Sequence, residues 1–416
     1  MNQAMIRIVV GAAVATGVLI VVLLWNGDRK GFEGDTSASG FPPGVEVLDS
    51  AGASGLVTRD LDTIPRCADC IQARLIGKVG TLTDSLLLRR LPHVVRDGRG
   101  RLLAGVRGQD HEILVYDLTR GLIGWFGRFG SGPGEMRRFN TFSVGPSDSI
   151  SLVHDGRFLT VFDRDFRAVR SIRLPIAARG GLIPLKHGRY VIPGWTATQE
   201  SAGKPLHLIS VDGNSTKSFG TENIVAVGPP ERFVSPGPNE TIFAAERHNY
   251  RIEQLDTAGT VLRTIGIRPP DSWHFREIMS HAHRDSIVTN RPPKDVTNAF
   301  ESRPTNLPFR PIPELAGLFV DSGHLWVAWH IGAANWESVA VNYRRTEEVI
   351  LTDDYKPKAY DTIVDIIDMR TGELLARRRV AGFCTLMNDG SLARLGYSIQ
   401  GVVEVEVFEL SFKPIS

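Results

Sequence analysis

Short apolar runs and polar turns alternate along residues 65–416. The apolar runs are rich in β-branched and aromatic residues, which favours strands, and Asp, Asn, Gly or Ser between them favours tight hairpin turns. One motif recurs: a strand that ends in Asp, a turn, and a second strand, as in ILVYDLTRGLIGWFG from Ile113. Its aspartates are Asp117, Asp163, Asp212, Asp256 and Asp368.

Two more strands precede each copy of this motif, as in HVVRDGRGRLLAGV from His93. The first three intervals between the aspartates are 46, 49 and 44 residues, the length of a four-stranded propeller blade. Six such inner hairpins predict an all-β, six-bladed β-propeller of four-stranded antiparallel blades. A seventh blade within the 112-residue interval before Asp368 is the alternative count.

The last blade lacks its outermost strand at the C-terminal end of the sequence. An unassigned strand at residues 73–80 precedes the first blade. We expect it to complete the last blade and close the ring, because closure removes an exposed sheet edge. The predicted propeller domain therefore spans residues 65–416.

Two insertions interrupt the strand pattern, at residues 271–311 and 332–361. The first is predicted to be partly helical and contains His274, His281 and His283. An H-x-H pair can hold a metal if a third ligand converges on it, so these are weak metal candidates. Solvated histidines on a lid are the simpler interpretation.

The N-terminal segment, residues 1–30, contains an apolar run from Ile8 to Trp25. At the helical rise its 18 residues span about 27 Å, close to the hydrocarbon thickness of a bilayer. We expect an uncleaved signal-anchor in the membrane through residues 8–25, with a cleaved signal peptide as the alternative. Residues 31–64 are rich in Gly, Ser, Asp and Pro and are predicted to form a flexible tether.

Cysteine usage agrees with a domain outside the cytoplasm. Cys67 and Cys70 stand in RCADC, and the chain has one other cysteine, Cys384, so four cysteines for a zinc site are not available within one chain. The residues that follow Cys70 are typical of a strand, whereas a thioredoxin-like centre opens a helix. We predict a Cys67–Cys70 disulfide, with the domain periplasmic or at the cell surface, or secreted if the N-terminal segment is cleaved. Cys384 lies in an apolar run and is predicted to be a buried thiol.

The charge balance excludes one class of partner. The 48 basic and 46 acidic residues give a net charge of +2, without a long basic run. Nucleic-acid binding needs clustered Lys and Arg to replace counterions, so no nucleic-acid partner is expected.

Two stretches resemble a known repeat family. ERHNYRIEQLDTAGTVLRTIG, residues 246–266, is similar to an NHL repeat, and GWFGRFGSGPGEMRRF, residues 124–139, resembles the join between two NHL blades. The Gly-rich stretch is followed by a strand, not by the helix that a phosphate loop requires. The anchor, tether, C-x-x-C pair and six blades together resemble bacterial cell-envelope propellers. That resemblance implies a binding or scaffold module more often than a known reaction.

The mouth of the central tunnel is the predicted ligand site, because loops on a rigid scaffold carry function. The side chains that we expect there are His93, Arg138, Asn140, Arg232, Trp329 and His330. Trp195 and Trp329 lie in second strands, where packing between blades is the alternative role. Trp125 and Trp326 are predicted to be core residues.

The sequence thus favours a membrane-anchored, extracytoplasmic module that binds a protein, peptide or glycan. The alternative is a hydrolase or lyase with its site in the central funnel, similar to six-bladed lactonases that hold calcium there. Glu314 and Asn140 are the one carboxylate and one amide expected at the starts of the inner strands, a poor set for Ca²⁺. No catalytic residue is identified, and enzymatic activity stays open.

Overall fold

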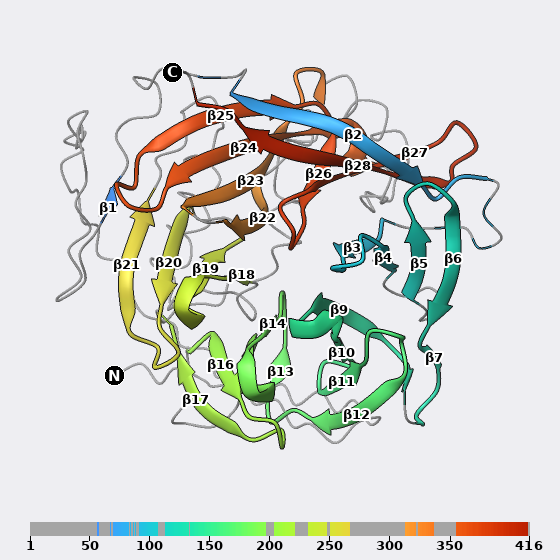
Figure 1. Ribbon diagram of the computed structural model, residues 1–416, viewed down its shortest axis with the longest axis vertical. Coiled ribbons are helices and arrows are strands. Elements are labelled where there is room, and N and C mark those ends of the chain that lie inside the picture. The colour runs from blue at the N-terminus through green and yellow to red at the C-terminus, as the bar shows by residue number, and fades with distance from the viewer. Residues whose placement is uncertain are drawn as a thin grey trace, which may run out of the picture. The chain divides into compact units, whose positions relative to one another are not determined.

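Six antiparallel sheets follow one another around a central axis (Figure 1). The computed structural model describes residues 56–57, 67, 70–106, 113–196, 204–220, 232–266, 313–336 and 355–414, apart from positions 83, 85, 87, 89, 90, 133, 248, 249 and 322. The first five sheets are built on strands that succeed one another in the chain, and the sixth adds an N-terminal strand to three C-terminal ones, so each sheet is one blade of a six-bladed β-propeller. The seventh blade of the alternative count would lie in part outside the described residues.

The first three blades use the strands between residues 93 and 219. Blade 1 contains β3 (His93–Arg96), β4 (Leu102–Gly105), β5 (Ile113–Asp117) and β6 (Gly121–Phe126). Blade 2 contains β9 (Phe139–Val144), β10 (Ile150–His154), β11 (Phe158–Phe162) and β12 (Ala168–Arg173). Blade 3 contains β13 (Ala177–Ala178), β14 (Ile183–Pro184), β15 (Tyr190–Trp195), β16 (Leu206–Ile209) and β17 (Ser215–Phe219).

The last three blades use the strands between residues 232 and 412. Blade 4 contains β18 (Arg232–Pro236), β19 (Ile242–Glu246), β20 (Arg251–Leu255) and β21 (Val261–Gly266). Blade 5 contains β22 (Glu314–Val320), β23 (His324–Gly332), β24 (Tyr360–Asp368) and β25 (Leu374–Val380). Blade 6 contains β26 (Phe383–Leu386), β27 (Leu392–Tyr397) and β28 (Val403–Phe412).

Two strands from the N-terminal side join the later blades. β2 (Ile71–Val79) pairs antiparallel with β28, from Ile71 opposite Phe412 to Val79 opposite Val405, and forms the fourth strand of blade 6. The short β1 (Leu56–Val57) lies parallel to β21 at the outer edge of blade 4. Cys67 and Cys70 form a disulfide directly before β2, as predicted.

The recurring aspartates have one structural role, which explains why the motif repeats. Asp117 Oδ1 accepts hydrogen bonds from the amides of Thr119 and Arg120, at 2.9 and 3.0 Å, and so closes the turn between the third and fourth strands of blade 1. The same acceptor role recurs at the four later turns, through Asp163, Asp212, Asp256 and Asp368. Asp is favoured at such turns because its short side chain reaches amides two to four residues ahead.

The apolar core lies between the blades rather than inside any one sheet. In the described part of the chain, six clusters of buried apolar residues each draw on at least two neighbouring blades. One of them packs Val94 and Leu114 of blade 1 against Leu395 and Val405 of blade 6. Each blade is therefore covered on both of its faces, as the near-continuous apolar strands require.

The tryptophan predictions were half right. Trp326 is buried, as expected, but the assignment of Trp125 to the core was wrong, because its side chain is 51% exposed. Trp125 lies on β6, the outermost strand of blade 1, next to a bulge in the β5–β6 pairing. Of the six residues of β6 only Phe126 is buried, because this strand is the outer edge of its sheet.

The stretch from Gly127 to Met136 connects blades 1 and 2, as predicted. β6 ends at Phe126 and β9 begins at Phe139, with the short paired strands β7 (Arg128–Phe129) and β8 (Glu135–Met136) between them. Gly134 has a φ of +77°, and a Cβ there would lie 2.9 Å from the Cβ of Ala168. The glycine is therefore needed for the chain path and not for a phosphate.

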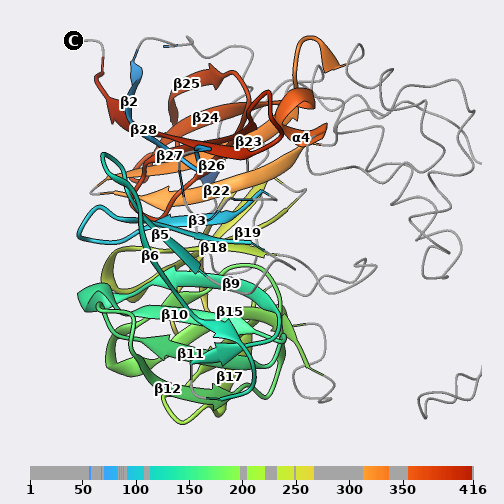
Figure 2. The same ribbon diagram turned by 90° about the vertical axis from the view of Figure 1, so that its right-hand side faces the viewer.

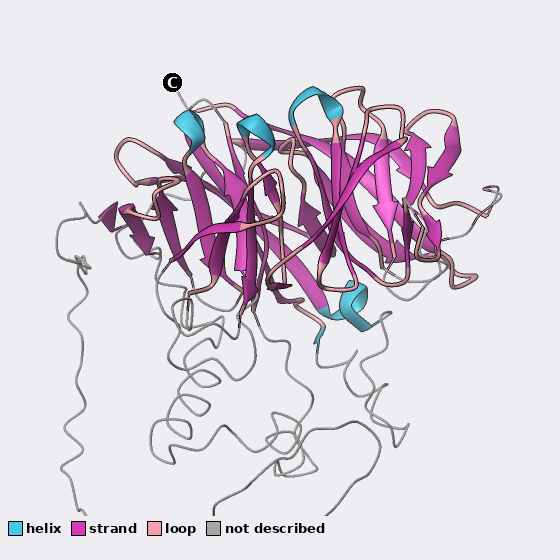
Figure 3. Ribbon diagram, turned by 90° about the horizontal axis from the view of Figure 1, so that it is seen from below, coloured by secondary structure: helices cyan, strands magenta, loops and turns pink. Residues whose placement is uncertain are grey.

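The two faces of the ring differ (Figures 2 and 3). The hairpin turns η1 (Pro146–Asp148), η2 (Lys186–Gly188) and η4 (Pro238–Glu240) lie on one face, which we call the η face. The helix α4 (Tyr355–Ala359) lies on the opposite face, the α4 face, where the chain enters each inner strand.

Several predictions concern residues outside the described part of the chain. These are the apolar segment 8–25, the insertion 271–311 with His274, His281 and His283, and most of the tether 31–64. The described helices are all too short, or too polar, to span a bilayer.

Candidate functional site

A buried carboxylate on the α4 face collects three basic side chains. Glu314 begins β22, the inner strand of blade 5, and its Oε2 accepts hydrogen bonds from Arg247 Nε and Nη2 at 2.8 and 2.6 Å. Its Oε1 accepts from Lys356 Nζ of α4 at 3.2 Å and lies 3.4 Å from His330 Nδ1 of β23. We call these four residues the Glu314 cluster. The carboxyl oxygens are thus engaged by protein cations.

The electrostatics of the cluster keep Glu314 ionised. Burial alone would raise the pKa of this carboxyl, but the contacts with His330, Lys356 and Arg247 hold it well below its usual range. Arg247 and Lys356 are each about one-third exposed, at 32% of their side-chain surface, so both cations face the solvent as well as Glu314.

The tautomer of His330 follows from its second contact. Nε2 lies 2.7 Å from the carbonyl oxygen of Cys384, which can only accept, so Nε2 carries a proton. Burial lowers the pKa of the imidazole, and Glu314 only partly opposes that shift. In the neutral ring Nδ1 then presents a lone pair to Glu314, and a proton on Nδ1 would complete a hydrogen bond within blade 5. The hydrogen bond from Nε2 to Cys384 already joins blade 5 to blade 6.

A second polar cluster adjoins the first in blade 4. Arg232 begins β18, is 3% exposed, and donates to Glu253 Oε2 at 3.1 Å and to Glu246 Oε1 at 3.2 Å. Glu253 also pairs with Arg251 at 3.3 Å. The two clusters are physically joined, because Arg247 follows Glu246 in the chain and its carbonyl accepts from the amide of Leu315 at 2.7 Å.

The other predicted residues lie apart from these clusters. His93 Nε2 is 3.0 Å from the carbonyl oxygen of Phe142, and Asn140 Oδ1 accepts from the amide of Gly156 at 2.8 Å. Arg138 is exposed, between β8 and β9. Trp329 is fully buried and stacks on Tyr250 with the ring centroids 4.2 Å apart. Of the predicted set, only Arg232 and His330 thus belong to the two joined clusters, Arg232 in blade 4 and His330 in blade 5.

Two residues of the Glu314 cluster were not in the predicted set. Arg247 lies just after a strand end, next to Glu246, and Lys356 lies in the second insertion. Arg247 could have been predicted as a site residue from the sequence, because it is a charged residue directly after the inner hairpin of blade 4. Nothing local marks Lys356, because its contact with Glu314 joins residues 42 positions apart.

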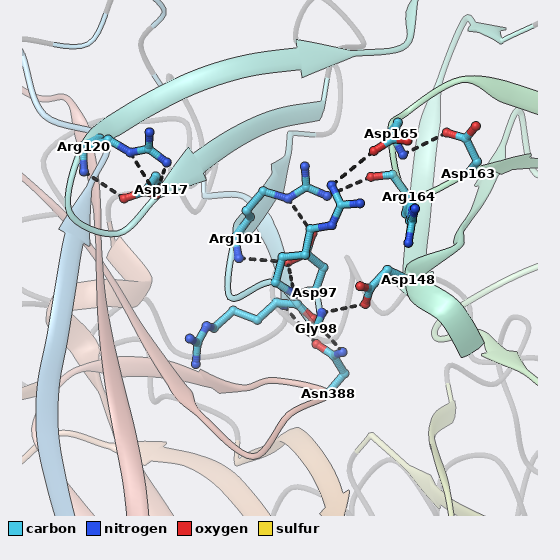
Figure 4. A network of polar contacts seen from close by, with 12 residues as sticks. Asp97, Gly98, Arg101, Asp117, Arg120, Asp148, Asp163, Arg164, Asp165 and Asn388 are labelled. Atoms are coloured by element: carbon cyan, nitrogen blue, oxygen red, sulfur yellow. Dashed lines mark hydrogen bonds and ion pairs between the residues drawn. The ribbon is translucent and has the colours of Figure 1, made fainter.

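The η face uses its charges differently (Figure 4). Asp148 of η1 accepts from the amide of Gly98 in blade 1 at 2.7 Å, and a Cβ at Gly98 would lie 2.5 Å from the same carboxyl oxygen. Arg101 donates to Asp97 at 2.7 Å and to the carbonyl of Arg164 in blade 2 at 2.9 Å. Asn388 exchanges two hydrogen bonds with the backbone of Arg96, which connects blade 6 to blade 1. These contacts fix neighbouring blades to each other.

The described residues offer neither a metal site nor a reactive thiol. None of the His, Cys, Asp and Glu side chains described there form a group of three placed to hold a metal ion. Cys384 is a buried thiol, as predicted, and burial raises its pKa to about 12. A thiol with so high a pKa is a poor nucleophile at neutral pH.

One solved structure agrees with the fold at a TM-score above 0.5. A protein of Bacteroides fragilis described as exported superposes with a TM-score of 0.53 at 11% identity, over 86% of this chain and 99% of its own. A streptogramin B lyase gives 0.41 at 10% identity, over 82% and 97%. A virginiamycin B lyase of Staphylococcus aureus gives 0.40 at 10% identity, over 82% and 99%. The likeness is one of fold. No protein-family model and no curated protein matches this sequence.

Proposed function

We propose that this chain is a binding module: an NHL-like propeller, closed by β2, that is anchored in a membrane and takes a protein, peptide or glycan ligand on its α4 face outside the cytoplasm. The observation that carries the proposal is the Glu314 cluster. Arg247 and Lys356 are held in place by a buried carboxylate and still expose a third of their side chains.

Such an arrangement suits binding, because the cations are pre-organised. A ligand does not have to immobilise two long flexible side chains, which otherwise costs about 0.5–1.5 kcal/mol each. The cluster also lies between blades 4 and 5, whose apolar interface gives it a rigid support. A hydrogen-bond acceptor on a ligand would find donors there that are already oriented.

The proposed location rests on two observations. The apolar run from Ile8 to Trp25 has the length of a membrane span. The Cys67–Cys70 disulfide fits an oxidising compartment. An alkaline phosphatase fused after Ser416 should be active in the host cell, and an inactive, intact fusion would contradict an extracytoplasmic propeller.

Binding is tested with the full-length chain in detergent on arrays of defined glycans and peptides. Arg247→Gln and Lys356→Gln should each weaken binding about ten- to hundredfold, because a hydrogen bond to a charged group contributes about 1.5–3 kcal/mol. Arg128→Gln is the matched control, since Arg128 is highly exposed and pairs with Glu135 in the connection between blades 1 and 2. Wild-type binding by both variants, or no binding by the wild type, would contradict the proposal.

A further inference from the structure

A cleft of about 250 Å³ opens on blade 6 beside α4. Its polar lining comes from Lys358 of α4, Arg394 of β27, and Glu404 and Glu406 of β28. Arg394 pairs with Glu406 across the two strands, and Gly396 pairs with Glu404, so these four residues share one face of the sheet. Tyr397 adds an aromatic residue to the lining.

The cleft is connected to the Glu314 cluster through α4. Lys356 and Lys358 are two residues apart on this short helix, and they serve the cluster and the cleft respectively. Lys356 also lies over the ring of Phe383, with Nζ 5.4 Å from the centroid, which places the helix against the first strand of blade 6. A ligand that occupies the cleft would therefore lie close to the proposed binding face.

Three of the four charged side chains that line the cleft are held in ion pairs. Arg394 donates through Nε, at 2.7 Å, and through Nη2 to the same oxygen, Glu406 Oε2. Glu404 Oε2 pairs with Lys78 of β2 at 2.8 Å. An ionic ligand could bind Arg394, Glu404 or Glu406 only by breaking one of these pairs.

The same pairs keep hydrogen-bonding capacity for a neutral ligand. Within the described part of the chain, Arg394 Nη1 makes no hydrogen bond, and neither does Glu406 Oε1 or Glu404 Oε1. Guanidinium donors and carboxylate acceptors therefore stand side by side in one wall. Hydroxyl groups both donate and accept, so adjacent hydroxyls can use both kinds of partner.

Gly396 lines the cleft and has no side chain to fill it. A Cβ on Gly396 would meet no atom within 4 Å. A liquid water occupies about 30 Å³, so the cleft has room for about eight waters. That space is enough for a single sugar ring and too small for a folded segment of protein.

From this geometry we propose that the cleft binds one uncharged sugar residue, with its vicinal hydroxyls on Arg394 and Glu406. This assignment rests on the proposed function and narrows its ligand to a neutral glycan. It names a site next to, and distinct from, the Glu314 cluster.

Filling the cleft tests the proposal directly. Gly396→Leu places a side chain into the open space without demanding an unusual backbone, because Gly396 is not in the left-handed region. Gly124→Leu is the matched control: Gly124 lies on β6 of blade 1, also has open space at its Cβ, and also lacks a positive φ. Unchanged thermal midpoints in both variants show that they fold.

The probes are glucose, galactose and N-acetylglucosamine, titrated into the full-length protein and followed by saturation-transfer NMR. At least one of these sugars should bind to a single site on the wild-type protein. Its affinity should fall at least tenfold in Gly396→Leu and in Glu406→Gln and should be unchanged in Gly124→Leu. Absence of binding by all three sugars, equal binding by Gly396→Leu, or tighter binding of glucuronate than of glucose would overturn the proposal.

The two proposals can fail separately. If none of the three sugars bind but an arrayed ligand still depends on Arg247 and Lys356, the cleft assignment is wrong and the proposed function stands. If a sugar binds in the cleft but Arg247→Gln and Lys356→Gln bind every arrayed ligand normally, the Glu314 cluster is not the binding surface.

Discussion

Removal of the buried carboxylate of Asp365 should destabilise the propeller severely. Asp365 of β24 has no exposed surface, and its oxygens accept hydrogen bonds from Arg377 Nε and Nη2 of β25 at 2.6 and 2.7 Å. The hydroxyl of Tyr250, from blade 4, donates to Asp365 Oδ2. The contact therefore joins two strands of one blade and also connects two blades.

The magnitude follows from what Asp365→Ala leaves behind. Arg377 is buried, so its guanidinium would remain in the interior without its counter-ion, which costs about 3–5 kcal/mol. A triple variant, Asp365→Leu, Arg377→Met and Tyr250→Phe, removes every member of the contact. Its stability should return to within about 2 kcal/mol of wild type, because a well-packed apolar set often replaces a buried ion pair without loss.

Guanidinium unfolding followed by tryptophan fluorescence measures both variants. The midpoint of the single variant should fall at an unchanged m-value, since the surface exposed on unfolding does not change. A loss below about 1 kcal/mol in Asp365→Ala would refute the reasoning, as would a triple variant no more stable than the single one.

Three further predictions concern stability. Burial lowers the pKa of His154, His207 and His330, so the unfolded chain takes up protons before the folded chain as the pH falls. Their contribution to stability is complete above about pH 6.5 and should be lost progressively as the pH falls below that value in unfolding titrations; a rise in stability over that range would contradict the prediction. Trp329→Ala should lower the free energy of unfolding by about 3–5 kcal/mol, measured by calorimetry or denaturant unfolding, because Trp329 is fully buried. Trp195→Ala, at a half-exposed site, should lower it by only about 0.5 kcal/mol, and equal losses in the two variants would contradict the prediction. Reduction of the disulfide should remove about 2 kcal/mol at most, because the Cys67–Cys70 loop is short, and unfolding on reduction alone would show a larger role.

The number of blades was predictable because its signal is local. Each recurring aspartate binds amides two to four residues ahead, so the turn and its flanking strands are encoded within about fifteen residues. The outermost position of β6 was not predictable from its own residues. Trp125 lies in an apolar strand pattern, but its place on the edge strand of the blade leaves it exposed.

The candidate site was predictable only in part, for a related reason. Arg232 and His330 were found from their places near the expected ends of the strands that line the tunnel. The sequence indicated Glu314 only as part of a poor ligand set for Ca²⁺. Its role at the centre of the cluster was not predictable, because its partners come from other elements. Arg247 is 67 residues from Glu314 along the chain, and the packing of blade 4 against blade 5 brings them together.

The register of β2 has a mechanical consequence. Ile71 and Phe412 form one pair of the β2–β28 ladder, and the amide of Lys413 donates to the carbonyl of Cys70 at 2.8 Å, so the start of β2 and the end of β28 lie side by side. A load applied between these two points would open the ladder one pair at a time, beginning with Ile71 and Phe412. A load that pulls β2 along its own length would strain all of its backbone hydrogen bonds together. The β2–β28 ladder should therefore withstand a larger force when β2 is pulled along its own length than when Ile71 is pulled away from Phe412.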